Sequence, residues 1–243
     1  MRIRSRRCTA AWICVATTDA SGEAVLSDQQ PGVERAVRKF IRPAMWVLAV
    51  LPAPVLIAQL LLDQLGADPI DKLERLTGEW ALRFLIASLA VTPLMRLTGW
   101  GWLVAQRRFL GLAAFFWALG HLSVYTVLDW FFDWQEITKD ILEHLYITLG
   151  MGAFLLMLPL ALTSTKASIR KLGGARWNRL HSLVYVSVIA ACLHFVWAVK
   201  KDITEPVIYG GIAALLLAFR VVWRPTPRAS VRVPSADSGS SGR

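Results

Sequence analysis

The sequence predicts an all-α protein, a polytopic membrane helix bundle with six transmembrane helices and both termini in the cytoplasm. Three observations predict this class. The 243 residues are 55% hydrophobic and only 18% charged, with a mean hydropathy of +0.47, whereas soluble domains carry about a quarter charged residues. The apolar residues gather into six long runs. The charges between the runs change sign from one connection to the next.

Each apolar run is long enough, or nearly so, to cross a hydrocarbon core of about 30 Å, which takes roughly 17 to 25 helical residues. A crossing segment must be helical, because irregular backbone in lipid leaves amides without hydrogen-bond partners. In chain order the runs are Pro43–Leu62, Trp80–Leu97, Phe109–Leu128, Tyr146–Leu162, His181–Val199 and Val207–Trp223. Between the first two, Pro69–Glu79 alternates apolar and charged residues at helical spacing, which favours a helix lying flat on the outer surface.

The charges of the connections predict the topology, because short cytoplasmic loops collect lysine and arginine. The basic segments contain Arg35, Arg38, Lys39 and Arg42 before the first run, Arg96, Arg107 and Arg108 after the second, Lys166, Arg170, Lys171, Arg176 and Arg179 after the fourth, and Arg224, Arg228, Arg232 and Arg243 in the tail. The first and third connections are acidic, and the fifth is balanced. Both termini are therefore expected inside, and the net charge of +10 marks topology rather than a nucleic-acid-binding surface.

Three parts are expected along the chain. Residues 1–39 form a flexible cytoplasmic extension, residues 40–223 form the membrane domain, and residues 224–243, rich in proline, serine and arginine, form a disordered cytoplasmic tail. The first 16 residues have a basic start and a short apolar stretch, as a signal peptide does, with a cytoplasmic extension or a misplaced start codon as alternatives. The three cysteines lack metal-ligand spacing and predict no disulfide framework.

Three of the four histidines, His121, His181 and His194, lie within or at the edge of membrane runs. An ionisable residue there is a candidate functional residue, with interhelical hydrogen bonding as the alternative. His121 lies 13 residues beyond the inner edge of its run and His194 lies 15 residues beyond the inner edge of its own. At about 1.5 Å per residue, both stand roughly 20 to 22 Å above the inner edge. Two imidazoles from different helices are therefore expected at the same level, in the outer half of the membrane.

Two level imidazoles are the arrangement that an axially ligated haem requires, with one neutral nitrogen on each side of the iron. Small residues on the run that bears His121 would leave room for the macrocycle, although they are also ordinary packing residues. These are Gly111, Ala113, Ala114, Ala118 and Gly120. A centre with both axial positions closed by protein favours electron transfer over oxygen activation.

His181 lies only about 3 Å above the inner edge, and about 140° of helix rotation separates it from His194 on an ideal straight helix. It has no histidine at a matching depth on the third run. Ligation with a different sixth ligand, a hydrogen bond to a flavin or quinone, and simple packing all remain open for it. His144, in an acidic connection, is expected to be solvated or interfacial.

Four long stretches of the chain resemble the haem-binding membrane subunit of the bacterial protein-methionine-sulfoxide reductase system, within the ferric-reductase-like transmembrane superfamily. They are Leu76–Leu94, Arg107–Asp129, Tyr146–Thr165 and Arg170–Val199, and the resemblance covers roughly Phe40 to Trp223. It carries the family's three membrane histidines over to His121, His181 and His194. The chain departs from the family at Glu143–His144, where a basic residue and proline are usual.

The resemblance implies a b-type haem (haem b) protein of the bacterial inner membrane, reported also to carry flavin mononucleotide (FMN). It implies electron uptake from the quinone pool or from a cytosolic flavin reductase. Electrons would pass to a periplasmic molybdopterin-containing subunit that reduces methionine sulfoxide in damaged proteins. The chain itself would then be an electron-transfer subunit of an oxidoreductase complex without catalytic residues.

Two other classes of function compete with this interpretation. A transporter or channel with histidine proton relays would be supported by carboxylates within the spans, and none lies inside the six runs. A self-contained metalloreductase would need flavin and nicotinamide domains, but the chain has no glycine-rich phosphate loop and no βαβ pattern. The sequence therefore favours a subunit that receives its electrons from another protein or from a quinone.

Overall fold

The computed structural model describes residues 17–18, 24–25, 31–199 and 202–222, and in this part the chain is almost entirely helical. Six helical segments of the described part are long and apolar enough to cross a membrane: Lys39–Leu61, Pro69–Thr98, Leu103–Asp129, Leu145–Leu162, Gly174–Ala198 and Thr204–Val222. The predicted fold class and the six spans are confirmed. The cytoplasmic placement of both termini stays a prediction.

The chain forms two compact units, residues up to Ala58 and residues from Gln59 onward. The first unit contains a two-residue antiparallel pair, β1 (Thr17–Thr18) and β2 (Ala24–Val25), followed by helix α1 (Pro31–Val50). Helix α2 (Pro52–Leu61) follows after one residue, because Pro52 has no N–H to continue the helical ladder. Most of the expected N-terminal extension, and all of the expected tail, lie outside the described residues.

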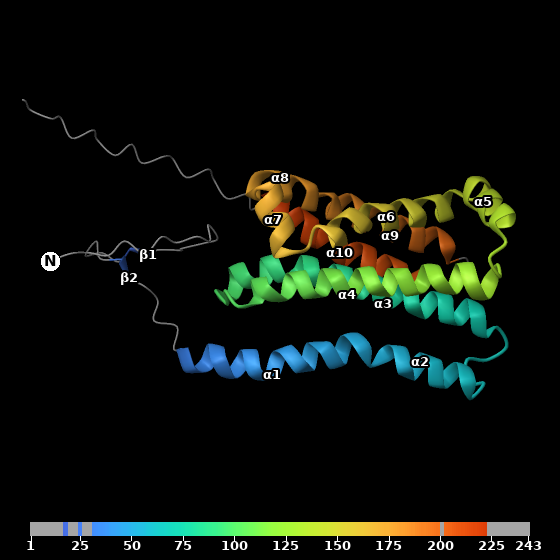
Figure 1. Cartoon of the computed structure of the whole chain (residues 1–243), viewed down its shortest axis with the longest axis horizontal. Helices are drawn as coiled ribbons and strands as arrows, with labels where there is room; N and C mark the ends of the chain where they lie inside the picture. Colours follow the sequence, from blue (N-terminus) through green and yellow to red (C-terminus); the bar gives the residue numbers. More distant parts are fainter. Residues whose placement is uncertain (1–16, 19–23, 26–30, 200–201, 223–243) are drawn as a thin grey trace, which may run out of the picture. The chain divides into compact units, whose positions relative to one another are not determined.

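The second unit is a bundle built from two helix pairs (Figure 1). Its elements are α3 (Pro69–Thr98), α4 (Leu103–Ser123), the π-helix η1 (Val124–Asp129), α5 (Trp134–Glu143), α6 (Leu145–Leu162), α7 (Lys166–Leu172), α8 (Gly174–His181), α9 (Leu183–Ala198) and α10 (Thr204–Val222). Helix α4 packs mainly on α3, and α9 packs mainly on α6. Helix α10 contacts α9 and α3, while α4 contacts α6, so the two pairs are joined on both sides.

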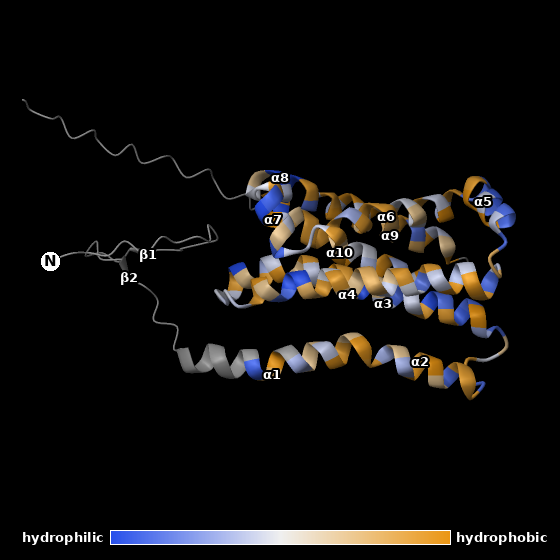
Figure 2. Ribbon diagram, viewed as in Figure 1, coloured by the Kyte–Doolittle hydropathy of each residue, from blue (hydrophilic) through white to orange (hydrophobic). Residues whose placement is uncertain are grey.

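Hydrophilic residues gather at the two ends of this bundle (Figure 2). One end carries the basic helices α7 and α8, and the other carries α5 with the acidic connections. Apolar residues dominate the helices between these ends, as expected for segments that face lipid. We call these the basic end and the acidic end.

Helix α3 corrects one prediction, because Pro69–Glu79 does not form a separate helix on the surface. It is the first third of one 30-residue helix. The Asp68 carboxylate caps this helix by accepting the Asp71 N–H at 3.3 Å, and Pro69 occupies the first turn, where its missing N–H costs nothing. The helix ends only at Gly99, whose φ of 74° closes the last turn. No proline lies between residues 70 and 92, so the helix continues past Glu79.

The acidic connection between α4 and α6 is more ordered than the sequence suggested. Its helix α5 begins at Asp133, whose carboxylate accepts the N–H groups of Gln135 and Glu136 at 3.1 and 3.2 Å. Ile137 is buried, and the Tyr125 hydroxyl donates to the Asp140 carboxylate at 2.6 Å. These contacts hold α5 against the π-helix that follows α4. The connection therefore has a defined structure at the acidic end.

Candidate haem-binding site

The bundle places His121 of α4 beside His194 of α9. Their ring centroids lie 6.1 Å apart, and the ring planes are inclined at 71°. The two residues belong to different helix pairs, and 73 residues of sequence separate them. The level pair expected from counting residues along each span is thus also a pair in space.

A backbone carbonyl orients each ring. His121 Nδ1 lies 2.9 Å from the Glu74 carbonyl oxygen on α3, and His194 Nδ1 lies 2.7 Å from the Tyr146 carbonyl oxygen on α6. Because a carbonyl oxygen only accepts, Nδ1 carries the proton in both rings, and the neutral ring keeps its lone pair on Nε2. Metal-ligating histidines commonly donate their other N–H in this way, which fixes tautomer and orientation.

A glycine lies against each ring, one helical turn after the carbonyl that holds it. Gly78 follows Glu74 by four residues, and Gly150 follows Tyr146 by four. A Cβ on Gly150 would stand 2.8 Å from His194 Nδ1, and a Cβ on Gly78 would stand 3.2 Å from His121 Nδ1. The same arrangement, a carbonyl acceptor followed four residues later by a glycine, therefore occurs at both histidines. Our sequence analysis missed both glycines, because it looked for small residues on the histidine's own helix rather than on the helix packed against it.

The geometry of the pair fits a haem. Two metal–nitrogen bonds of about 2 Å each, plus the distance from each nitrogen to its ring centre, span about the observed centroid separation. Among the described residues no group of three or more His, Cys, Asp or Glu side chains is placed to hold a bare metal ion. A haem iron needs only two protein ligands, because the porphyrin supplies the other four nitrogens.

The small residues of α4 have a mixed role. A Cβ on Gly111 would meet the Ser88 hydroxyl of α3 at 3.7 Å, and Ala113 and Ala114 are buried. Gly111 thus lies against α3, and all three residues are placed for helix packing, which is the alternative role considered above. Gly120 lies next to His121 in sequence, and a Cβ there would meet nothing within 4 Å.

Aromatic rings pack beside the histidine pair and further along the bundle. The Tyr146 ring stacks near His194, with centroids 6.2 Å apart and planes inclined at 25°. Further along the bundle, Phe115 of α4 stacks on Phe154 of α6 at 5.6 Å, where the two helix pairs meet. These ring contacts join α4 to α6 and α6 to α9 around the histidines.

Carboxylates do lie within the helices that are long enough to span, contrary to the prediction from sequence, and among the described residues Glu79 is the buried one. Glu79 is 4% exposed, and its oxygens lie 3.0 Å from Arg75 Nε and 2.9 Å from Arg83 Nη2, one turn away on either side. Arg75 also pairs with Glu205 of α10 at 2.9 Å, and Arg83 donates to the Tyr209 hydroxyl at 2.8 Å. The predicted span began one residue too late to include Glu79. The spacing of four residues between opposite charges was the signal that could have revealed the network.

His181 stands apart from the pair, at the basic end. Its ring stacks on Trp177 with centroids 3.9 Å apart, and its Nε2 lies 3.1 Å from the Thr163 hydroxyl. Trp177 also donates to the Thr163 carbonyl oxygen at 3.0 Å, so the three side chains form one cluster between α6 and α8. The helix is interrupted at Ser182. The rotation of about 140° between His181 and His194, given for an ideal straight helix, stays a prediction.

His144 lies where an interfacial residue was expected. Its side chain is 49% exposed and its Nδ1 lies 2.8 Å from an Asp140 carboxylate oxygen. It also precedes α6 as the residue at the helix boundary. The Glu143–His144 sequence, unusual for the family resemblance, thus sits between two well-formed helices and leaves the paired histidines undisturbed.

Comparison with known proteins supports the same kind of site. Residues 77–192, which include His121 and His181, match the family model described as "Ferric reductase like transmembrane component". The protein-methionine-sulfoxide reductase heme-binding subunit MsrQ of Rhodospirillum rubrum is 47% identical over 80% of this chain and 93% of its own length. Those of Herminiimonas arsenicoxydans and Azospira oryzae are 46% and 48% identical, over 75% and 76% of this chain and 85% and 79% of their own lengths. No solved structure matches the chain.

These relatives share nearly half of the aligned residues with this chain, over three quarters or more of its length. The resemblance drawn from the four sequence stretches is confirmed. The chain therefore belongs to the MsrQ family of haem-binding subunits of protein-methionine-sulfoxide reductase, within the ferric-reductase-like membrane proteins.

Proposed function

We propose that this chain is a membrane b-type cytochrome subunit in which His121 and His194 hold haem b. One observation carries the proposal: two imidazoles from different helix pairs stand 6.1 Å apart, each with its Nδ1 proton fixed on a backbone carbonyl. Both Nε2 lone pairs would then be available to hold a haem iron. A haem bound there supplies reversible one-electron chemistry.

The chain itself would orient the two imidazole rings and keep them close to the neighbouring helices. Glu74 and Tyr146 fix the tautomers through their carbonyl oxygens, while Gly78 and Gly150 let the rings lie close to the neighbouring helices. A haem held by both His121 and His194 would be suited to electron transfer rather than to oxygen binding. The chain thus carries electrons and does no substrate chemistry itself.

The direction of transfer follows from the topology and the family. In a bacterial inner membrane with the basic end inside, the pair lies toward the periplasm, since Glu74 and Tyr146 belong to the first turns of α3 and α6 at the acidic end. Electrons would enter from the quinone pool or a cytosolic flavin reductase. They would leave to a periplasmic molybdopterin-containing methionine-sulfoxide reductase subunit. The relatives' names describe a haem-binding subunit, so haem carries the proposal, and FMN stays an expectation from the family resemblance.

An absorption spectrum of the purified full chain, taken oxidised and then reduced, tests the assignment. The unaltered chain should show a reducible low-spin haem band. His121→Ala and His194→Ala should each abolish it, because either change removes one axial nitrogen from a site with little water to replace it. His144→Ala, which alters an exposed histidine near the same end, is the matched control and should keep the band. Normal spectra in both ligand variants would overturn the proposal.

His181 is proposed to act in electron entry rather than in ligating this haem. It lies about 20 Å along the helix from His194 and is held by Thr163 and Trp177 at the basic end. His181→Ala should leave the spectrum of the outer haem intact and slow its reduction by a cytoplasmic-side donor. Complete loss of haem in this variant would instead make His181 a ligand and require a different pairing.

A further inference from the structure

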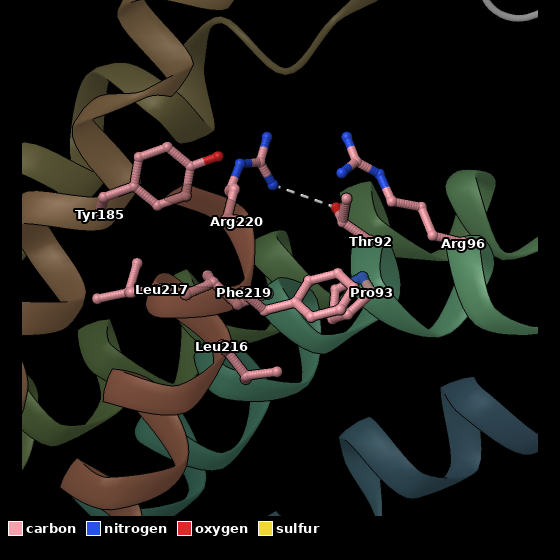
Figure 3. A pocket seen from close by; sticks show the side chains of 9 residues that line it. Thr92, Pro93, Arg96, Tyr185, Leu216, Leu217, Phe219 and Arg220 are labelled. Carbon is pink, nitrogen blue, oxygen red and sulfur yellow. Dashed lines mark hydrogen bonds between the residues drawn. The ribbon is translucent and has the colours of Figure 1, made fainter. Parts of the chain in front are cut away.

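A cavity at the basic end lies between the ends of α3, α9 and α10, well away from the histidine pair. It is a shallow cavity that is open to its surroundings, with about 270 Å³ of empty space when the open space at its mouth is included. Figure 3 shows the guanidinium groups of Arg96 and Arg220 extending to the same side of it, with the apolar side chains of Pro93, Leu216 and Phe219 on the other. The cavity is therefore amphipathic, with cations along one side and hydrocarbon along the other.

The Arg220 guanidinium is held in place without an acidic partner. It donates to the Thr92 hydroxyl at 3.2 Å and lies over the Tyr185 ring at 4.8 Å from the centroid. Within the described residues it makes no salt bridge, although it is partly buried. A positioned guanidinium that keeps donors unused is well suited to a phosphate, which accepts its N–H groups in pairs.

Further positive charge converges on the same place. Arg96 lines the cavity together with Arg220, so two guanidinium groups face the same space. An anion between two guanidinium groups that face one space would accept hydrogen bonds from both. The cluster therefore points to a bound anion.

We propose that this cavity binds the phosphate of an anionic phospholipid headgroup. The basic end is the one that the distribution of lysine and arginine places at the cytoplasmic leaflet, where basic pockets between membrane helices bind such headgroups. Leu216, Leu217 and Phe219 line the same cavity as the arginines, so apolar surface for an acyl chain adjoins the cations. A free phosphate would use the arginines and leave this apolar surface uncovered.

Lipid binding to the purified full chain, detected by native mass spectrometry and by the thermal unfolding midpoint, tests the proposal. The probes are dioleoyl phosphatidylglycerol, dioleoyl phosphatidylcholine and inorganic phosphate. Phosphatidylglycerol should remain bound and raise the midpoint, whereas the other two should do neither. Arg220→Gln should weaken phosphatidylglycerol binding about fivefold, as expected for one arginine near an anionic surface. Arg220→Lys should retain part of the affinity.

Arg170→Gln is the matched control, because it removes one exposed arginine from the same end outside the cavity. It should change phosphatidylglycerol binding less than about twofold, because a single exposed charge is largely screened by salt. Equal losses in Arg170→Gln and Arg220→Gln would show general surface attraction and overturn the site. Equal retention of phosphatidylcholine, or stabilisation by inorganic phosphate as large as that by phosphatidylglycerol, would overturn the lipid as its occupant. An unchanged haem spectrum in every variant shows that the bundle is still folded.

Discussion

At the scale of single residues, the site depends on how closely each imidazole approaches the helix packed against it. The same four-residue spacing occurs twice, with a carbonyl that accepts Nδ1–H and a glycine one turn later. The approach is tighter at Gly150 than at Gly78, since an added Cβ would stand 2.8 Å rather than 3.2 Å from its ring. Glycine is costly in a helix interior, and here the absence of a side chain is what lets each ring reach its carbonyl.

We therefore expect Gly150→Ala to displace His194 and lower haem affinity by about 10- to 100-fold, the range for loss of a metal ligand's orienting contact. Gly78→Ala should have a smaller effect, because its neighbour needs to move only a few tenths of an ångström. Haem content per chain and the reduced spectrum measure both. Gly152→Ala is the control, since a Cβ there meets nothing within 4 Å. Full haem content in Gly150→Ala would show that the close approach is not required.

At the scale of elements, the network around Glu79 connects α3 with α10. Glu79 pairs with two arginines on its own helix, and these reach Glu205 and Tyr209 on α10. Gly78, which lies against His121, is the residue before Glu79. The network thus holds the segment of α3 that supports one histidine. Both carboxylate oxygens of Glu79 are paired, so it acts as a structural link rather than as a free proton carrier.

Glu79→Gln should lower the thermal unfolding midpoint of the full chain, at a cost of about 1 to 3 kcal/mol. Loss of one partner from a buried pair costs about 3 to 5 kcal/mol, and partial exposure of both arginines reduces this. Glu205→Gln is the matched control. Glu205 contacts the same Arg75 but is 44% exposed, so its loss should cost about 1 kcal/mol or less. Equal effects of the two changes would contradict a burial-dependent role.

At the scale of the whole bundle, the two ends differ in charge. The histidine pair lies toward the acidic end, which is covered by the ordered helix α5, while His181 and the arginine-lined cavity lie at the basic end. Acidic residues such as Asp129, Asp133 and Glu136 are exposed at the acidic end. Complementary charge would steer a soluble acceptor with a basic patch toward the haem, chiefly by raising the association rate.

We expect reduction of such an acceptor to slow as ionic strength rises, because salt shortens the reach of these charges. Replacing Asp129, Asp133 and Glu136 together with their amides should slow transfer further. An asparagine introduced in place of Asp133 can still cap α5, so the helix should remain. Stopped-flow reduction of the acceptor measures the rate, and the haem spectrum should not change. If the rate of acceptor reduction changes neither with salt nor with the substitutions, these acidic residues determine topology alone.

Much of this protein could be predicted from its sequence, because membrane physics acts on local composition. The length of an apolar run and the charge of its connections determine where a helix crosses lipid, so all six spans were found with ends within a few residues in most cases. Depth along a helix is equally local, so His121 and His194 could be placed level before any packing was known. The start of α3 was misjudged because its charges looked like those of a surface helix.

Only the tertiary structure decided which helix lies against which. The pairing of α3 with α4 and of α6 with α9 brings the Glu74 and Tyr146 carbonyl oxygens to the two histidines, and it makes Gly78 and Gly150 necessary. It also buries Glu79 between two arginines and gathers Arg96 and Arg220 around one cavity. Such contacts join residues far apart in the chain, and in lipid they depend on close packing and hydrogen bonds between helices rather than on local hydrophobicity. For that reason the sequence determined the spans and the level of the histidines, while packing decided what holds them.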